Sequence, residues 1–516
     1  MIGFIGSLLW VTVVLTLIVI AVVIVARLLF RLPPRNILET GKARPASMAT
    51  ELGRITTPLV ACHPGLSGIA ALGEGNDAFA ARMILVDAAE DSIDAQYYIW
   101  HGDLTGTLLL DALWRAAERG VRVRLLLDDN GTSGLDHQIA QLVSHANVQV
   151  RLYNPFNLRR FKVLSYGFDF FRLNRRMHNK CLVIDGAVAV LGGRNIGDEY
   201  FDTGLTPLYV DLDVLTVGRV VPEIAADFDR YWNAPPVHPA GPIVGAPPAT
   251  DPIAQDLARY RSDPQFATYK EQVGGSQLVQ RLARGTLDLE WTDAVLVSDT
   301  PAKGEGAVAR EDLLASRLTN AVGEIADCFD GISPYFVPSK AGVRAFATLA
   351  ERGVKVRMLT NSLEATDVLP VHAGYAKHRR DLLNAGVEVF ELRKRIAVKI
   401  PVEETGPFGS SGASLHAKTF AVDRARVFVG SFNFDPRSTT LNTELGLLID
   451  SPPMAGRIHD AFDRALDRKA WRVRRDGSEL VWEVAEEDPM RHEPGTNLPR
   501  RVALWTIGKL PVEWLL

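Results

Sequence analysis

The sequence is poor in cysteine and has no large excess of charge of either sign. It contains three cysteines in 516 residues, Cys62, Cys181 and Cys328, and none of them forms a CxxC pair. This spacing argues against a cysteine-based zinc site and against a disulfide framework, and three scattered thiols fit a reducing compartment. The formal net charge of -4 gives the whole chain no attraction to nucleic acid, so any binding of anions must come from local patches.

The chain opens with a long apolar run that has no charged side chain before Arg27. A run of this length can cross a bilayer as one helix. A cleaved signal peptide is the alternative, but the basic start, short apolar core and small-residue cleavage site that it requires are not evident. We therefore expect an uncleaved anchor, ended by Pro33 and Pro34. By the positive-inside rule, the basic residues that follow place the body of the protein in the cytoplasm: Arg27, Arg31, Arg35, Lys42 and Arg44.

Two stretches of the remaining chain are near copies of each other. AERGVRVRLLLDD begins at residue 117 and AERGVKVRMLTNS begins at residue 350. Each follows a helix-like stretch and turns at a glycine into a strand. Hydrophobic residues make up 47% of the chain, as in a globular protein with a full core. The repeat predicts two tandem α/β domains with mixed, mostly parallel sheets flanked by helices.

The segment between the copies has a different composition. Residues 232–252 contain seven prolines, which predict a stiff, irregular connector, and the sequence to about residue 310 adds no clear pattern. We therefore divide the chain into an anchor at 1–32, a linker at 33–60, a first domain at 61–232, a proline-rich linker and insertion at 233–310, and a second domain with a C-terminal tail at 311–516.

A histidine-lysine motif occurs once in each copy, as HxKxxxxDxxxxxxG[GS]xN. A single HxK would be weak evidence, but matched positions in a duplicated fold are not explained by structural histidines beside solvated lysines. The members are His178, Lys180, Asp185 and Asn195 in the first copy, and His416, Lys418, Asp423 and Asn433 in the second.

The residue types of this motif favour an anion over a metal. A histidine and a lysine two apart on a strand point to the same face and can reach one target. Lysine does not suit a metal centre, but it suits an anion, and asparagine adds a further donor. We predict a phosphoryl group held by the two lysines and two asparagines, with no metal or other cofactor. Asp185 and Asp423 complete the catalytic motifs, and their parity suggests that they fix the turn or a neighbouring charge and do not touch the substrate.

Two histidines beside one phosphoryl group allow a two-step displacement. A neutral histidine attacks phosphorus and forms a phosphohistidine, and a protonated one gives its proton to the leaving alkoxide. The second histidine then takes a proton from the incoming hydroxyl, so the pair titrates as a unit. Glu199 and Glu444 follow the motifs and are candidates for orienting the imidazoles. Ordinary surface or helix-cap acids are the alternative reading of both.

The duplicated motif resembles the mark of the phospholipase D superfamily. Within it, the stretches LNRRMHNK, GGRNIGDEYF, SDTPAKGEG, VHAGYAKHR, GASLHAK and GSFNFDPRS resemble the bacterial cardiolipin synthases, particularly their C branch, from about residue 60 to the C-terminus. The resemblance implies two phospholipase D-like domains around one pseudo-two-fold site in a bacterial protein. The C branch lacks so clear an N-terminal span, so the expected inner-membrane location rests on the apolar run of this sequence. It implies transfer of a phosphatidyl group from phosphatidylethanolamine or phosphatidylglycerol to phosphatidylglycerol, with His178 as nucleophile and His416 as acid and base.

Other features of the sequence agree with a lipid substrate. Residues 156–176 contain six basic residues, one acid and several aromatics, and residues 392–400 are similar, which is typical of surfaces that meet anionic headgroups. Solvated faces over core aromatics are the alternative. The tail at 500–516 either lies at the membrane interface through Trp505 and Trp514 or packs on its own domain.

Three other functions remain open at this point. A phospholipase D hydrolase would use the same chemistry with water as the acceptor. A phosphodiesterase acting on nucleic acid is disfavoured by a pI near 6.3 and by the anchor, so we expect no nucleic-acid partner. A non-catalytic membrane scaffold is disfavoured because both motifs are intact. The sequence identifies no accessory protein.

Overall fold

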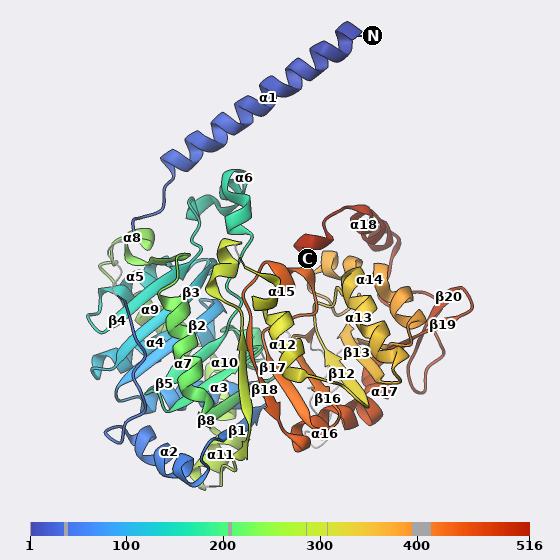
Figure 1. Ribbon diagram of the computed structural model, residues 1–516. Helices are drawn as coiled ribbons and strands as arrows, with labels where there is room; N and C mark the ends of the chain where they lie inside the picture. Colours follow the sequence, from blue (N-terminus) through green and yellow to red (C-terminus); the bar gives the residue numbers. More distant parts are fainter. Residues whose placement is uncertain (1, 36–39, 205–208, 285, 307, 395–413) are drawn as a thin grey trace.

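A computed structural model describes residues 2–35, 40–204, 209–284, 286–306, 308–394 and 414–516. The folded body has two α/β halves side by side, and helix α1 (Ile2–Leu29) projects from the first half (Figure 1). Each half contains a nine-stranded sheet covered by helices, so the predicted fold class is confirmed.

The two sheets share the order of their six central strands. The first runs β10-β1-β8-β6-β5-β2-β3-β4-β9 and the second β11-β18-β17-β16-β12-β13-β14-β19-β20, so that the central run from β8 to β4 corresponds to the run from β18 to β14. The first consists of β1 (Ser67–Leu72), β2 (Ser92–Ile99), β3 (Arg122–Gly131), β4 (Val148–Tyr153), β5 (Cys181–Ile184), β6 (Val188–Gly192), β8 (Asp213–Gly218), β9 (Val237–Pro239) and β10 (Glu290–Thr292). The second consists of β11 (Ala294–Ser298), β12 (Cys328–Ile332), β13 (Lys355–Asn361), β14 (Glu388–Leu392), β16 (Thr419–Val422), β17 (Arg426–Gly430), β18 (Leu445–Asp450), β19 (Ala470–Asp476) and β20 (Glu479–Glu483).

Contrary to the expectation of mostly parallel sheets, parallel pairing is confined to three neighbouring strands in each described sheet. β2, β3 and β4 are parallel, as are β12, β13 and β14, and the other pairings within the two sheets are antiparallel. Parallel strands need crossover connections, which the chain provides as helices between these strands. The motif strands instead form hairpins, β5–β6 and β16–β17, across turns in which Asp185 and Asp423 have positive φ.

Helices cover both sheets. The first half has α2 (Glu51–Cys62), α3 (Gly75–Ala88), α4 (Leu104–Glu118), α5 (Asp136–Ser144), α6 (Lys162–Leu173), α7 (Val220–Trp232), α8 (Gly241–Val244), α9 (Pro252–Arg261), α10 (Pro264–Gly274) and α11 (Gln277–Ala283). The second half has α12 (Leu314–Val322), α13 (Ser339–Glu351), α14 (Leu369–Asn384), α15 (Pro436–Thr440), α16 (Pro452–Asp460), α17 (Leu466–Lys469) and α18 (Leu498–Lys509).

The segment at 233–310, which we expected to be a linker and insertion, folds onto both halves. β9 and β10 form the two edges of the first sheet, and β11 forms an edge of the second. Helices α9, α10 and α11 pack on α3 and α4. Three helices of this segment have a proline in their first turn: Pro242 in α8, Pro252 in α9 and Pro264 in α10. Pro252 and Pro264 each follow a capping aspartate, Asp251 and Asp263. We propose that the two domains meet between β10 and β11.

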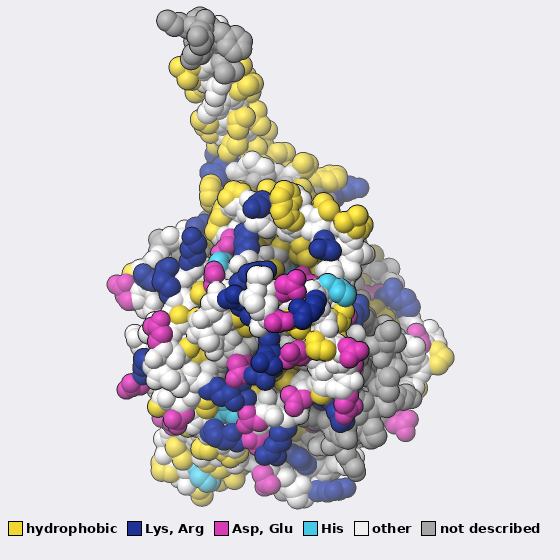
Figure 2. Space-filling view, turned by 90° about the vertical axis from the view of Figure 1, so that its right-hand side faces the viewer, with side chains coloured by type: hydrophobic (Ala, Val, Ile, Leu, Met, Phe, Trp, Pro, Cys, Tyr) yellow, Lys and Arg dark blue, Asp and Glu magenta, His cyan; other side chains and the backbone are white. Residues whose placement is uncertain are grey.

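Helix α1 stands apart from the folded body. Its segment Leu9–Leu29 has a mean hydropathy of 3.1 and is not buried, and Figure 2 shows hydrophobic side chains along it. At its base, Arg27 Nε donates to the carbonyl oxygen of Phe168 in α6 at 2.8 Å, and the ring centroids of Phe30 and Phe168 lie 6.0 Å apart. A single exposed apolar helix at the N-terminus fits the predicted membrane anchor.

The basic stretches and the tail take up different positions. Residues 156–176 include α6, next to the base of α1. Of the stretch at 392–400, residues 395–400 lie outside the described residues. In the tail, Trp505 on α18 is exposed, whereas the carbonyl oxygen of Leu516 accepts from Arg437 N at 2.8 Å. The tail therefore ends packed on its own domain.

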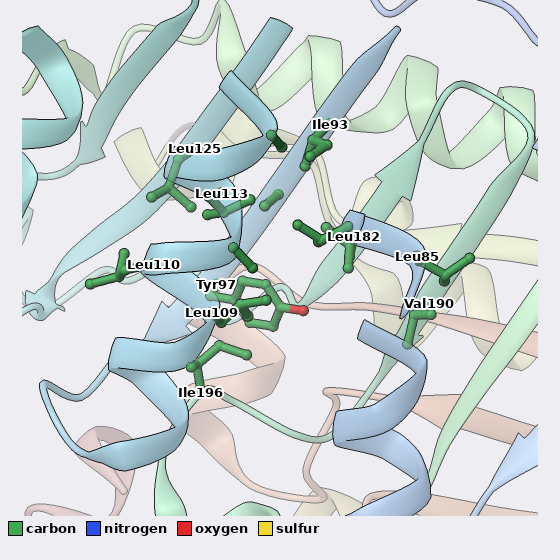
Figure 3. Close-up of a cluster of buried hydrophobic side chains, with 14 of the residues drawn as sticks. Leu85, Ile93, Tyr97, Leu109, Leu110, Leu113, Leu125, Leu182, Val190 and Ile196 are labelled. Atoms are coloured by element: carbon green, nitrogen blue, oxygen red, sulfur yellow. The ribbon is translucent and has the colours of Figure 1, made fainter. Parts of the chain in front are cut away.

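Buried side chains fill the space between helices and sheet in the first half. Figure 3 shows Leu109, Leu110 and Leu113 of α4 against Tyr97 of β2 and Leu125 of β3. A second core cluster takes residues from both sheets and joins the halves, so the fold holds the two motif strands in a fixed relation.

Candidate active site

Short pairings across the interface bring the two motifs together. Met177 forms a parallel bridge with Thr443, and β15 (Ser414–Leu415) pairs with β7 (Tyr209–Val210). The backbone N–H of His178 donates to Thr443 O at 2.9 Å, and that of His416 donates to Val210 O at 2.8 Å. Each histidine is thereby attached to the opposite half, next to an acid: Glu444 follows Thr443, and Asp211 follows Val210.

The acids that follow these bridges bind the histidines. His178 Nδ1 lies 2.9 Å from Glu444 Oε2, and His416 Nδ1 lies 2.6 Å from Asp211 Oδ2. Each pair joins one half to the other. A carboxylate on Nδ1 fixes the ring and leaves Nε2 available to a substrate. Glu444 thus lies where a residue that orients His178 must lie.

Glu199 does not have the corresponding position at His416. Its Oε1 instead lies 3.2 Å from Nδ1 of His101. Sequence reasoning missed Asp211, although Asp211-Leu212 and Glu444-Leu445 occupy equivalent places at the start of β8 and β18. The loop from Asn195 to Asp211 is longer than the loop from Asn433 to Glu444, which obscures the correspondence. The shared acid-leucine pair at the start of β8 and β18 was the sequence pattern that could have identified Asp211.

Both motif lysines are buried beside their histidines. Lys180 Nζ donates to His178 O at 2.5 Å, and Lys418 Nζ lies 2.9 Å from His416 Nδ1. Burial lowers the pKa of both ammonium groups, well below the ordinary lysine value for Lys180. Two buried cations at one place are costly unless an anion compensates them. The arrangement therefore suits a bound phosphoryl group.

The two motif asparagines have unequal surroundings. Asn195 Nδ2 donates to the hydroxyl of Tyr200 at 3.0 Å, and its Oδ1 accepts from Ile99 N at 3.2 Å. Asn433 is buried, and its Oδ1 has no hydrogen-bond partner among the residues that the structure describes. A role for both in phosphate binding, through the amide nitrogen, remains a prediction.

The two motif aspartates accept hydrogen bonds from backbone N–H groups and not from the histidines. The Asp185 carboxylate accepts three backbone N–H groups from residues 90–92 at 2.9–3.1 Å. Asp423 accepts three from residues 326–328 at 2.8–2.9 Å. These segments lead into β2 and β12, so each aspartate ties its hairpin turn to the neighbouring strand, as the parity of the motif suggested.

Two further residues position the motifs. Asp128 Oδ2 accepts from the backbone N–H of Met177 at 2.8 Å, and Asn361 Oδ1 accepts from that of Leu415 at 2.9 Å. Asp128 lies on β3 and Asn361 on β13, at matching positions of the repeated AERGV stretches. They fix the residue directly before each histidine.

The two histidines differ in their electrostatic environment. The pKa of His178 is lowered well below the ordinary value by burial and then by the charges of Lys180, Lys418 and His416. Burial and Lys418 also lower the pKa of His416, but Asp211 acts in the opposite direction. His178 therefore favours the neutral form, and His416 is the better placed of the two to hold a proton.

The two acids differ in the same sense. Burial raises the pKa of Glu444 to about 7. Burial would also raise the pKa of Asp211, but Lys418 and His416 outweigh it and hold this pKa far below its ordinary value. Asp211 is therefore ionised at neutral pH, while Glu444 titrates near neutrality.

One group of side chains offers metal-type ligands. Atoms of His101, Asp103 and Glu199 lie within 4.8 Å of one another. Asp103 already caps α4, because its Oδ1 accepts from Gly106 N at 3.1 Å. Its Oδ2 accepts from Asp198 N at 2.7 Å. The Asp103 carboxylate is thus engaged in local structure.

The sequence matches a family model and known proteins over most of its length. A family model described as "Cardiolipin synthase, PLD-like domain" matches residues 83–232 and 317–466, each match containing one motif. The chain is 46% identical to cardiolipin synthase C of Escherichia coli over 470 residues, 90% of this chain and 99% of the relative. It is 26% identical to a cardiolipin synthase of Oceanobacillus iheyensis over 412 residues, 79% of this chain and 71% of the relative.

A solved structure shares the fold. The phosphatidylserine synthase of Haemophilus influenzae matches with a TM-score of 0.57 and 14% sequence identity, covering 90% of this chain and 99% of that one. At this identity the likeness concerns the arrangement of the two halves.

Proposed function

The chain belongs to the cardiolipin synthases with phospholipase D-like domains, and we propose that it transfers a phosphatidyl group from phosphatidylethanolamine or phosphatidylglycerol to a second phosphatidylglycerol. The observation that carries this proposal is the pair of crossed histidine-acid contacts, His178–Glu444 and His416–Asp211, each beside a buried lysine. Such a site provides a nucleophile, a proton donor and cationic charge for one phosphoryl group.

The first step forms the covalent intermediate. Neutral His178 attacks phosphorus through Nε2, a P–N bond forms, and the P–O bond to the headgroup alcohol breaks. His416 gives its proton to the departing alkoxide, which leaves as ethanolamine or glycerol. The lowered pKa of His178 supports its role as nucleophile, and ionised Asp211 supports a protonated His416.

The second step transfers the phosphatidyl group. His416, now neutral, takes the proton of a glycerol hydroxyl of phosphatidylglycerol, and that oxygen attacks phosphorus. The P–N bond breaks and cardiolipin is released. Lys180 and Lys418 stabilise the charge on the phosphoryl oxygens in both steps, with Asn195 and Asn433 as further donors.

Burial of the site favours transfer over hydrolysis. His178 is 6% and His416 4% exposed, and both lysines are 1% exposed. A site that excludes water protects the intermediate until a hydroxyl carried by lipid enters. The resemblance to the C branch favours phosphatidylethanolamine as donor.

We further propose that the body rests on the membrane next to its anchor. Exposed apolar side chains gather around α6 and α18, at the end of the body beside α1, where Figure 2 shows them interspersed with basic side chains. This composition fits an interface with anionic lipid. Basic residues after the span support a cytoplasmic body and an inner-membrane location. The exposed apolar side chains are Phe161, Val163, Leu164, Phe171, Leu498, Val502, Trp505, Leu510 and Trp514.

Product analysis by mass spectrometry tests this function. The purified full chain would be placed with chelator in vesicles of phosphatidylglycerol alone and in vesicles that also contain phosphatidylethanolamine. We expect cardiolipin from the wild type and none from His178→Ala or His416→Ala, and the vesicles that yield it identify the donor. Phosphatidic acid without cardiolipin would indicate a hydrolase instead.

A further inference from the structure

An apolar groove opens in the second half, between α12 and α13. It has a volume of about 1080 Å³, and its floor is made of aromatic rings on the sheet and the loop after β17. Small residues of α13, among them Ala341, Gly342 and Ala345, form one wall. Volumes of this order are those of ligand sites. The rings that line it are Phe329, Phe346, Phe420, Phe432 and Phe434.

One end of the groove is lined by residues of the loop that carries Asn433 of the second motif. Phe432 and Phe434 flank Asn433, and Phe420 follows Lys418 by two positions on the same face of its strand. The backbone N–H of Val337, just before α13, donates to Phe434 O at 2.8 Å. The groove therefore starts beside the motif of the second half and runs along α13 away from it.

The equivalent place in the first half is filled by side chains. There α3 and α4 pack on each other, and Leu109 and its neighbours occupy the space above the sheet (Figure 3). When the two AERGV stretches are aligned, Leu108 corresponds to Ala341 and Leu109 to Gly342. At these two positions the second half thus has a small residue where the first has a leucine, which leaves more space beside α13.

The dimensions and ends of the groove suit a hydrocarbon chain. A helix of 13 residues such as α13 is about 20 Å long, and the chains of one bilayer leaflet span about 15 Å, half of the hydrocarbon core. Trp514 lines the groove, and its ring lies 6.4 Å from that of Phe170 in α6, beside the anchor. Arg352 lies at the far end of α13.

We propose that this groove holds one acyl chain of the phospholipid whose phosphoryl group lies at the two histidines. The chain runs from Phe434 toward Arg352, and the length of the groove sets a preference for chain length. This proposal rests on the proposed function, because it takes the ligand of that site to be a diacyl phospholipid.

Tryptophans placed at successive positions along α13 test whether the length of the groove sets the preferred acyl-chain length. Ala345→Trp obstructs the groove about 6 Å beyond Ala341 along the helix, and Thr348→Trp about 4.5 Å further. For each variant, kcat/KM would be measured with phosphatidylglycerols from dihexanoyl to dioleoyl in mixed micelles. Arg344→Trp, on α13 but outside the groove lining, is the matched control, and thermal unfolding verifies folding.

We expect the ratio of kcat/KM for dioleoyl over dihexanoyl lipid to fall about tenfold in Ala345→Trp, less in Thr348→Trp, and not in Arg344→Trp. Equal ratios in all variants would overturn the proposal while leaving cardiolipin synthesis intact. As a test that needs no turnover, phosphatidylglycerol with a diazirine near one chain end should label α12 or α13 in the wild type. Labelling confined to other segments would contradict it.

Discussion

Nδ1 of His178 lies 2.9 Å from Oε2 of Glu444, a residue 266 positions later in the other half of the molecule. The contact is repeated with the halves exchanged, between His416 and Asp211. Neither half therefore contains a complete histidine-acid pair. The two copies of the fold act as one catalytic unit, and their interface is part of the site.

Replacing Glu444 should change the pH dependence of the reaction. Burial raises the pKa of Glu444 to about 7, so ionisation above this pH strengthens its support of a positively charged His178 ring. We expect the wild-type kcat to rise between about pH 6 and 8. Glu444→Gln keeps an acceptor but should lower kcat about a hundredfold and remove this rise. A pH profile of cardiolipin formation checks both effects.

Asp211→Asn is the matched control for that experiment. The pKa of Asp211 is held far below neutrality by Lys418 and His416, so this group does not titrate in the neutral range. Its replacement should lower kcat while the rise near neutral pH persists. A rise that survives in Glu444→Gln would show that another group titrates.

Removing the charge of Lys180 should raise the pKa of His178. Lys180 is the first of the charges that, after burial, lower this pKa. We expect Lys180→Met to lower kcat about a hundredfold, because a phosphoryl-binding charge is lost, and to shift the acidic limb of kcat/KM to higher pH. The exposed Lys340→Met should do neither. An unshifted acidic limb would show that the charge of Lys180 does not lower the pKa of His178.

The motif aspartates should act on stability. Asp185 is buried and accepts three backbone N–H groups, so Asp185→Ala should cost about 2–3 kcal/mol of unfolding free energy. The pKa of Asp423 is lowered because three backbone N–H groups outweigh its burial. Its contribution is therefore present above the unfolded pKa, near 3.8, and is lost as pH falls through the lower folded pKa. The unfolding free energies of wild type and Asp423→Asn in urea should differ at neutral pH, and this difference should shrink as the pH falls below about 4. A constant difference would contradict this role.

The anchor and the surface around α6 and α18 should contribute separately to membrane binding. Deleting residues 1–32 should release the protein from membranes in high salt, while binding to phosphatidylglycerol vesicles at low salt persists. Adding Phe171→Ser and Trp505→Ser should weaken that residual binding about tenfold or more. Vesicle sedimentation measures both. Residual binding that is insensitive to salt and to these substitutions would place the membrane contact elsewhere.

The sequence predicted those parts of the site that are local in the chain. His178 with Lys180, the turn at Asp185 and the apolar α1 each follow from a short pattern. Asp211 did not, because its role depends on a contact with the other half and its loop differs in length from that of Glu444. Glu199 is an acid that follows the first motif, as an orienting residue would, but its carboxylate lies beside His101.

The sheet topology and the middle segment were harder to predict for a related reason. The alternation of helices and strands around residues 117 and 350 comes from the three parallel strands, and the antiparallel hairpins around them carry no comparable signal. The prolines of residues 232–252 suggested a linker, yet the last of them, Pro252, opens α9, which packs on α4 of the first half. The partner of α9 in space, α4, is distant in sequence.

The central claim is that the phosphatidyl group passes through His178. Wild-type protein would be mixed with phosphatidylglycerol, stopped in alkali to preserve a P–N bond, digested, and analysed by mass spectrometry. The account predicts an adduct on the peptide that contains His178, present in wild type and absent from His178→Ala. An adduct on the His416 peptide, or turnover without any adduct, would contradict it.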